Sequence, residues 1–114
     1  MCQMKLEKKE HYLMVTLNGE FILGSTSEIK EKVKNYAEAN QLYRLVIDLS
    51  DVSFMDSSGL GALIAWFKMI NEHQGKIIFN NPSAYVRKIM GYAKLDKILD
   101  ITDSFEEANA LMEQ

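Results

Sequence analysis

The residues of this sequence that could do chemistry are gathered in one segment, Asp56-Ser57-Ser58-Gly59-Leu60-Gly61. A serine hydroxyl acts as a nucleophile when a base lies beside it, and serine or aspartate before a helix accepts hydrogen bonds from free backbone N–H groups. Two glycines in the first turn of a helix need an explanation, because each costs helix stability. Their bare backbone lets another molecule or a neighbouring element approach closely.

Spacing alone favours the structural interpretation, in which these side chains simply cap a helix. A dinucleotide site is not supported, because Gly59-Leu60-Gly61 lacks the third glycine and the acidic residue of that fingerprint, and no P-loop lysine is present. A serine hydrolase would need a base and the Gly-x-Ser-x-Gly pattern, which is absent. The histidines, His11 and His73, are expected in exposed loop or helix-end positions, away from any such role.

Three aspartates close in sequence, Asp48, Asp51 and Asp56, raise the alternative of a small enzyme with a magnesium or acid–base site. Asp48 is expected in a strand and Asp51 in a turn, where aspartate commonly bonds its own backbone. No base, nucleophile and orienting group converge in the pattern. We therefore predict no enzymatic activity, no metal site and no cofactor.

The elements that position this segment follow an alternating strand and helix rhythm, which predicts an α/β fold with parallel strands and an antiparallel edge from the opening strands. Ser25 with Glu28 predicts a capping box, Asn81-Pro82 starts a later helix and Thr102-Asp103 caps the last one. The expected strands are 4–6, 11–17, 45–49, 76–79 and 95–101, and the first two expected helices are 25–38 and 58–72.

The helix expected after the motif is apolar on two sides of its helical wheel. One stripe is assigned to the core: Leu60, Leu63, Ile64, Phe67 and Ile70. The other side is predicted to bind a partner protein, since tryptophan and methionine suit interfaces: Gly61, Ala62, Ala65, Trp66 and Met69.

Composition bounds the classes of protein that the chain can belong to. Its 114 residues are enough for one domain, and 13 basic against 16 acidic residues give a net charge of −3. This charge argues against nucleic acid as a partner, because non-specific binding there needs a basic surface. The single cysteine, Cys2, indicates a reducing cytoplasm, and no apolar run is long enough for membrane insertion.

The segment from Val46-Ile47-Asp48-Leu49-Ser50 through Phe54-Met55 to the Asp56 motif resembles the STAS domain family, and more narrowly the bacterial anti-sigma factor antagonists. The resemblance covers nearly the whole chain, from Gly19-Glu20-Phe21 to the terminal helix. It implies a single STAS domain over residues 1–114, with a mixed central sheet and about four helices packed mainly on one side.

The resemblance also implies a phosphorylation switch without enzymatic activity. Unphosphorylated antagonists bind an anti-sigma factor that is also a serine kinase, so that a sigma factor is released. Phosphorylation by that kinase ends the binding, and a metal-dependent serine phosphatase reverses it. By its place after the aspartate of the motif, Ser57 is the modified residue, in a neighbourhood of Asp56, Ser58 and Gly59, with Ser58 expected as a cap.

One position departs from the family pattern, in which many relatives carry a second acidic residue where this chain has Ile22. That region lies close to the phosphorylated serine in the family, so the departure bears on how Ser57 is phosphorylated. The alternative function is a non-switching STAS accessory subunit of a transporter or another regulatory complex, in which Ser57 is only a cap.

Overall fold

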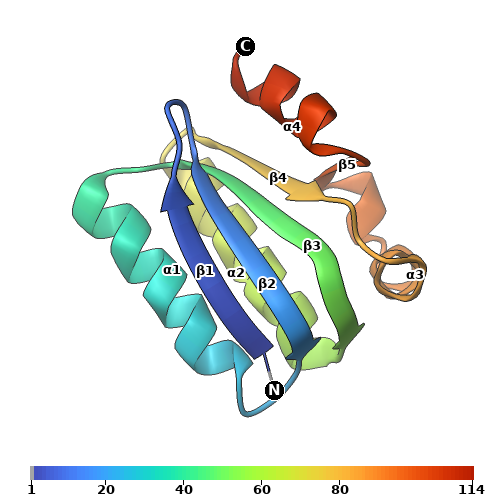
Figure 1. Ribbon diagram of the computed structural model, residues 1–114. Coiled ribbons are helices and arrows are strands. Elements are labelled where there is room, and N and C mark those ends of the chain that lie inside the picture. The colour runs from blue at the N-terminus through green and yellow to red at the C-terminus, as the bar shows by residue number, and fades with distance from the viewer. Residues whose placement is uncertain (1) are drawn as a thin grey trace.

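The computed structural model describes residues 2–114, in which strands and helices largely alternate along the chain (Figure 1). The strands are β1 (Cys2–Lys8), β2 (Leu13–Phe21), β3 (Arg44–Met55), β4 (Lys76–Asn80) and β5 (Asp100–Thr102). The helices are α1 (Thr26–Asn40), α2 (Ser57–Glu72), α3 (Ala84–Tyr92) and α4 (Phe105–Met112), with a 3₁₀ turn η1 (Leu95–Lys97).

The strands form one mixed sheet in the order β1-β2-β3-β4-β5. β1 and β2 are antiparallel, whereas the pairs β2–β3, β3–β4 and β4–β5 are parallel. The apolar run Leu45-Val46-Ile47 lies in the middle of this sheet and is completely buried, because both faces are covered there. The predicted α/β class and the antiparallel edge are confirmed.

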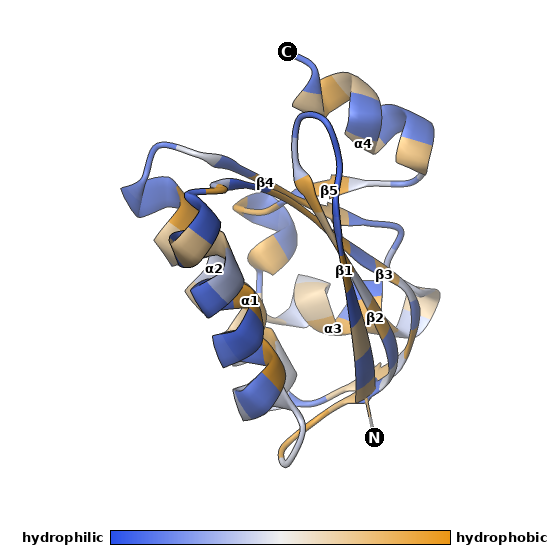
Figure 2. Ribbon diagram, turned by 60° about the vertical axis from the view of Figure 1, so that its left-hand side comes forward, coloured by the Kyte–Doolittle hydropathy of each residue, from blue (hydrophilic) through white to orange (hydrophobic). Residues whose placement is uncertain are grey.

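Helices cover the two faces of the sheet unequally (Figure 2). Side chains of α1, α2 and α3 belong to the main core on one face. A smaller cluster on the other face joins Ala108 and Met112 of α4 to Met14, Val46 and Ile78 of the sheet. The expected arrangement of about four helices, packed mainly on one side, is confirmed.

The strands that lead to the motif are longer than the sequence predicts. β3 does not end at residue 49 but continues to Met55, and β2 continues to Phe21 through register shifts around Asn18 and Gly19. Pairing with β4 ends at Asp48, so the second half of β3 pairs with β2 alone and accommodates polar side chains. As a result, Asp56 is the one residue between β3 and α2.

The predicted capping box at the start of α1 is wrong. Ser25 occupies the N-cap position, but its side chain makes no capping hydrogen bond. The Ser25 hydroxyl donates instead to the carbonyl oxygen of Ile22 at 2.9 Å, and the Glu28 carboxylate pairs with Lys32 at 2.9 Å. The sequence pattern is present, but a turn before the helix takes the hydroxyl.

The predicted caps of the last two helices are each displaced by a short distance along the chain. Ser83 caps α3 in place of Asn81, accepting a hydrogen bond from Val86 N. Ser104 caps α4 in place of Thr102-Asp103, accepting from Glu107 N at 3.1 Å. At the start of each of these helices several residues that make good N-caps follow one another, so the sequence does not single out one of them. Thr102 in addition belongs to β5.

Candidate functional site

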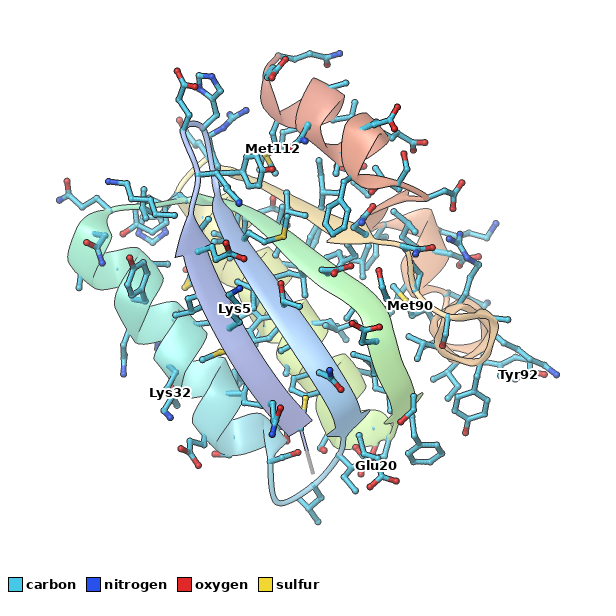
Figure 3. All side chains as sticks on the ribbon, viewed as in Figure 1. Lys5, Glu20, Lys32, Met90, Tyr92 and Met112 are labelled. Atoms are coloured by element: carbon cyan, nitrogen blue, oxygen red, sulfur yellow. The ribbon has the colours of Figure 1, made fainter. Side chains whose placement is uncertain are left out.

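The motif lies where the carboxyl ends of β2 and β3 meet at one edge of the sheet. Phe21 and Met55, the last residues of these strands, are register partners. The chain leaves β2 through the loop Ile22–Ser25 and leaves β3 through Asp56, so these segments lie side by side. Figure 3 shows Glu20 at this edge. Ligands of open α/β sheets commonly bind at the carboxyl ends of parallel strands.

Asp56 is the centre of the hydrogen bonding at this edge. One carboxylate oxygen, Oδ1, accepts from Ser58 N at 3.0 Å, Gly59 N at 3.2 Å and Ser58 Oγ at 2.6 Å. The other, Oδ2, accepts from Leu23 N at 3.0 Å. Asp56 therefore caps α2 and ties the loop after β2 to the start of that helix.

These donors favour the ionised form of the carboxyl group. The hydrogen bond from the Ser58 hydroxyl, followed by that from Leu23 N, lowers the pKa of Asp56 from 3.8 to about 2. The side chain is therefore a full negative charge at neutral pH, next to the two serines.

The two serines of the motif occupy different environments. Ser57 is the first residue of α2 and is exposed, and no hydrogen bond to its hydroxyl is found within residues 2–114. Ser58 is half-buried: its hydroxyl donates to Asp56 and accepts from Thr26 Oγ1 at 3.2 Å. The expectation that Ser58 is the cap is wrong, because Asp56 holds that position.

The loop Ile22–Ser25 and Thr26 belong to this site, although sequence reasoning did not assign Leu23 or Thr26 to it. Leu23 donates its backbone N–H to Asp56, and Thr26 reaches Ser58 from the first turn of α1. Ile22, where the family pattern has an acidic residue, accepts backbone hydrogen bonds from Ser25 N and Thr26 N. The signal that could have placed these residues in the site is the parallel pairing of β2 and β3. Parallel strands bring their carboxyl ends together, so the segments that follow them are neighbours.

The two glycines of the motif have different structural surroundings. A Cβ atom at Gly59 would overlap the carbonyl oxygen of Phe21 and lie 2.5 Å from Met55 Cγ, so this glycine lets α2 pack closely on β2 and β3. A Cβ atom at Gly61 would meet nothing within 4 Å, and Gly61 is exposed. The fold explains Gly59 and does not explain Gly61.

The predicted partner-binding side of α2 is largely wrong. Ala62, Trp66 and Met69 are 2%, 1% and 8% exposed, and the indole N–H of Trp66 donates to the carbonyl oxygen of Lys30 in α1. Because α2 packs against both the sheet and α1, its buried residues form one broad arc centred on Trp66. The helical wheel used in the sequence analysis divided this single buried arc into a core stripe and a partner-binding side.

What remains accessible on α2 is the side centred on Ser57. Ser57, Gly61 and Lys68 are exposed there, and Leu60, Ile64 and Ala65 are half-buried beside them. We call these six residues the exposed face of α2. Gly61 and Ala65 of the predicted contact residues lie on it, and two residues of the predicted core stripe, Leu60 and Ile64, lie on it as well.

His73 and Asp48, which were weighed for chemistry, do not approach Ser57. His73 follows the C-terminus of α2, about 24 Å along the helix from Ser57. Its ring stacks on Tyr43, with centroids 3.8 Å apart. Asp48 is 5% exposed and accepts from the Ser50 hydroxyl at 2.6 Å. Within residues 2–114, no three His, Cys, Asp or Glu side chains are grouped to hold a metal ion.

No helix within residues 2–114 is both long enough and apolar enough to cross a bilayer.

A mixed sheet with α2 starting at the carboxyl end of β3 places the chain in the α/β class. The STAS domain model matches residues 3–108, so the chain belongs to the STAS domain family.

Relatives and solved structures agree with this assignment. The anti-sigma F factor antagonist of Paenibacillus polymyxa is 30% identical over 97% of this chain and 93% of its own length. The anti-sigma-B factor antagonist of Bacillus subtilis is 31% identical over 89% of this chain and 91% of its own length. The anti-sigma factor antagonist SpoIIAA in its unphosphorylated form has the same fold, with a TM-score of 0.86 and 24% identity over 97% of this chain and 96% of that one.

The pKa of Asp56 predicts how its contribution to stability depends on pH. Since the folded-state pKa lies below the ordinary value, the ionised cap stabilises the fold above about pH 4 and loses this effect as the pH falls towards 2. Asparagine caps helices equally well but does not titrate. The stability difference between wild type and Asp56→Asn, measured as urea midpoints at pH 6 and pH 3, should shrink at the lower pH. A difference that stays constant would contradict the assigned pKa shift.

The two glycines give opposite predictions for one substitution. Gly59→Ala should destabilise the fold by about 3 kcal/mol, because the new methyl group overlaps backbone atoms of β2. Gly61→Ala should stabilise it by about 0.5–1 kcal/mol, because alanine is the better helix former and the space is open. Denaturant unfolding of the two variants and the wild type measures both effects. A destabilised Gly61→Ala would mean that the fold itself requires this glycine.

Proposed function

We propose that this chain is an anti-sigma factor antagonist that works as a phosphorylation switch in the cytoplasm. Unphosphorylated, it binds an anti-sigma factor that is also a serine kinase. Phosphorylated on Ser57, it releases that partner, and a metal-dependent serine phosphatase restores the first state. The relatives named above carry the antagonist function in their names, and SpoIIAA has been solved in a phosphorylated as well as an unphosphorylated form.

The observation that carries the proposal is the difference between the two serines. A kinase must reach the hydroxyl that it modifies, and Ser57 is exposed at the start of α2. The hydroxyl of Ser58 is held by Asp56 on one side and Thr26 on the other. This difference in accessibility supports Ser57 as the modified residue.

A phosphate on Ser57 is compatible with the fold. It brings about −1.5 to −2 charge at neutral pH, and free N–H groups and the helix dipole favour negative charge at a helix N-terminus. We therefore expect little change in the backbone on phosphorylation.

The same phosphate opposes binding once a partner covers it. Asp56 is already ionised beside Ser57, so a covering partner would desolvate two neighbouring negative charges. A loss of about 2.8 kcal/mol weakens binding about 100-fold. A change of this size switches a partner without any refolding of the domain.

The partner contact is assigned to the exposed face of α2. Gly61 is one turn from Ser57 on that face, and its missing side chain leaves the helix backbone open to close approach. Half-buried Leu60, Ile64 and Ala65 supply apolar surface around it. This surface replaces the buried Trp66 and Met69 as the contact region.

Substitution of Ser57 tests the switch directly. Ser57→Asp should bind a kinase-type anti-sigma factor about 100-fold more weakly than Ser57→Ala, because only the aspartate carries a charge into the interface. Isothermal titration with purified candidate kinases measures both affinities, and Ser58→Ala is the matched control that leaves Ser57 available for phosphorylation. Equal affinities of Ser57→Asp and Ser57→Ala would refute the switch.

Mass spectrometry of the native protein separates this function from the alternative of a non-switching accessory subunit. The switch requires a phosphate on Ser57 under some growth condition. The alternative predicts an unmodified Ser57 and a stable complex with a transporter or other regulatory subunit.

Gly61 gives a second test of the contact surface. Gly61→Ala should weaken binding to the same kinase about tenfold, because its methyl group occupies the place of the approaching partner, although the substitution stabilises the free domain. Gly91→Ala is the matched control, since it adds the same methyl group to α3, where the nearest atom outside that helix's backbone lies 3.8 Å away. Loss of affinity in both variants would remove the assignment to α2.

A further inference from the structure

The free edge of β1 is a second feature of the surface, apart from Ser57. Within residues 2–114, β1 pairs with β2 along its 7 residues and with no other strand. The opposite edge of the sheet is β5, which has only 3 residues. A long free edge presents unpaired backbone N–H and C=O groups and is a template for a further strand.

Helix α1 lies under the place where that further strand would run. In Figure 1, α1 lies beyond β1 on the side away from β2, and Figure 2 shows that this helix covers one face of the sheet. A strand added to β1 would therefore have a helix beneath it.

A cavity of about 360 Å³ opens between this edge and the helix. Its apolar walls come from β1, from the loop after β2 and from α1: Cys2, Met4, Ile22, Leu23 and Ile29. Leu23 is 80% exposed at this cavity, and Glu28 and Lys32 also line it. The cavity can accept apolar side chains that point from an added strand towards α1.

Charge indicates which kind of strand fits. β1 and the residue after it carry Lys5, Lys8 and Lys9 against one acidic residue, Glu7, which lies 3.5 Å from both Lys5 and Lys9. This segment keeps a positive excess, although Glu10 follows it and the whole chain has a net charge of −3. The Lys5 side chain is 70% exposed. An acidic segment is therefore favoured over a basic one at this edge.

We propose that the groove between β1 and α1 binds an extended acidic segment of a partner protein by strand addition. Backbone hydrogen bonds to β1 hold the segment, alternate apolar side chains enter the cavity, and the acidic side chains between them face Lys5. The groove shares the loop Ile22–Ser25 with the Asp56 site, but Ser57 does not line it, and binding there does not require the switch.

Peptide titrations followed by ¹⁵N amide shifts test the proposal on the full chain. The probe is acetyl-Val-Glu-Val-Glu-Val-amide, with its fully N-methylated analogue and the lysine counterpart acetyl-Val-Lys-Val-Lys-Val-amide as controls. The acidic probe should give saturable shifts in β1, the loop Ile22–Ser25 and the first turns of α1. The N-methylated and basic peptides should bind at least about tenfold more weakly, since they lack the N–H donors or the complementary charge.

A charge reversal completes the test. Lys5→Glu should weaken the acidic probe and strengthen the basic one, whereas Lys97→Glu, a matched reversal outside the groove, should leave both unchanged. Equal binding of the N-methylated peptide, shifts centred on β5, or no saturable shift at millimolar peptide would each overturn the proposal. Because none of these measurements uses a kinase, their outcome is independent of the function proposed for Ser57.

Discussion

The carboxylate of Asp56 is the interaction on which the rest of the site depends. It closes the N-terminus of α2 and at the same time fixes the backbone of Leu23, which belongs to a different connection of the fold. It also occupies the hydroxyl of Ser58 and thereby leaves Ser57 as the free serine. One side chain thus caps the helix, holds the loop and contributes to the difference between two adjacent serines.

The architecture could be predicted from the sequence because its strongest signals are local. The buried run of β3 and the alternation of strands with helices are visible in the order of residue types, and they specify a parallel sheet. The ends of elements could not be predicted as well. β3 continues through polar residues because only β2 pairs with its second half, and such pairing is not encoded locally.

The surface of α2 shows where a helical wheel stops being informative. Apolar residues surround most of this helix, and a wheel cannot say which of them face a sheet, another helix or a partner. Trp66 is covered because α1 packs over it, while Ile64 is only half-buried on the opposite side. The residues without side chains were the more useful signal, since Gly59 marks close packing and Gly61 an open surface.

The hydrogen bond between Leu23 and Asp56 joins positions separated by 33 residues. The bonds from Ser58 and Gly59 to the same carboxylate are local, and a short peptide containing the motif could form them. The surroundings of Ser57 are thus part local and part tertiary. A protein that recognises the complete arrangement distinguishes the folded domain from a nascent or unfolded chain with the same sequence, so recognition at this edge also reports that β2, β3 and α1 have assembled.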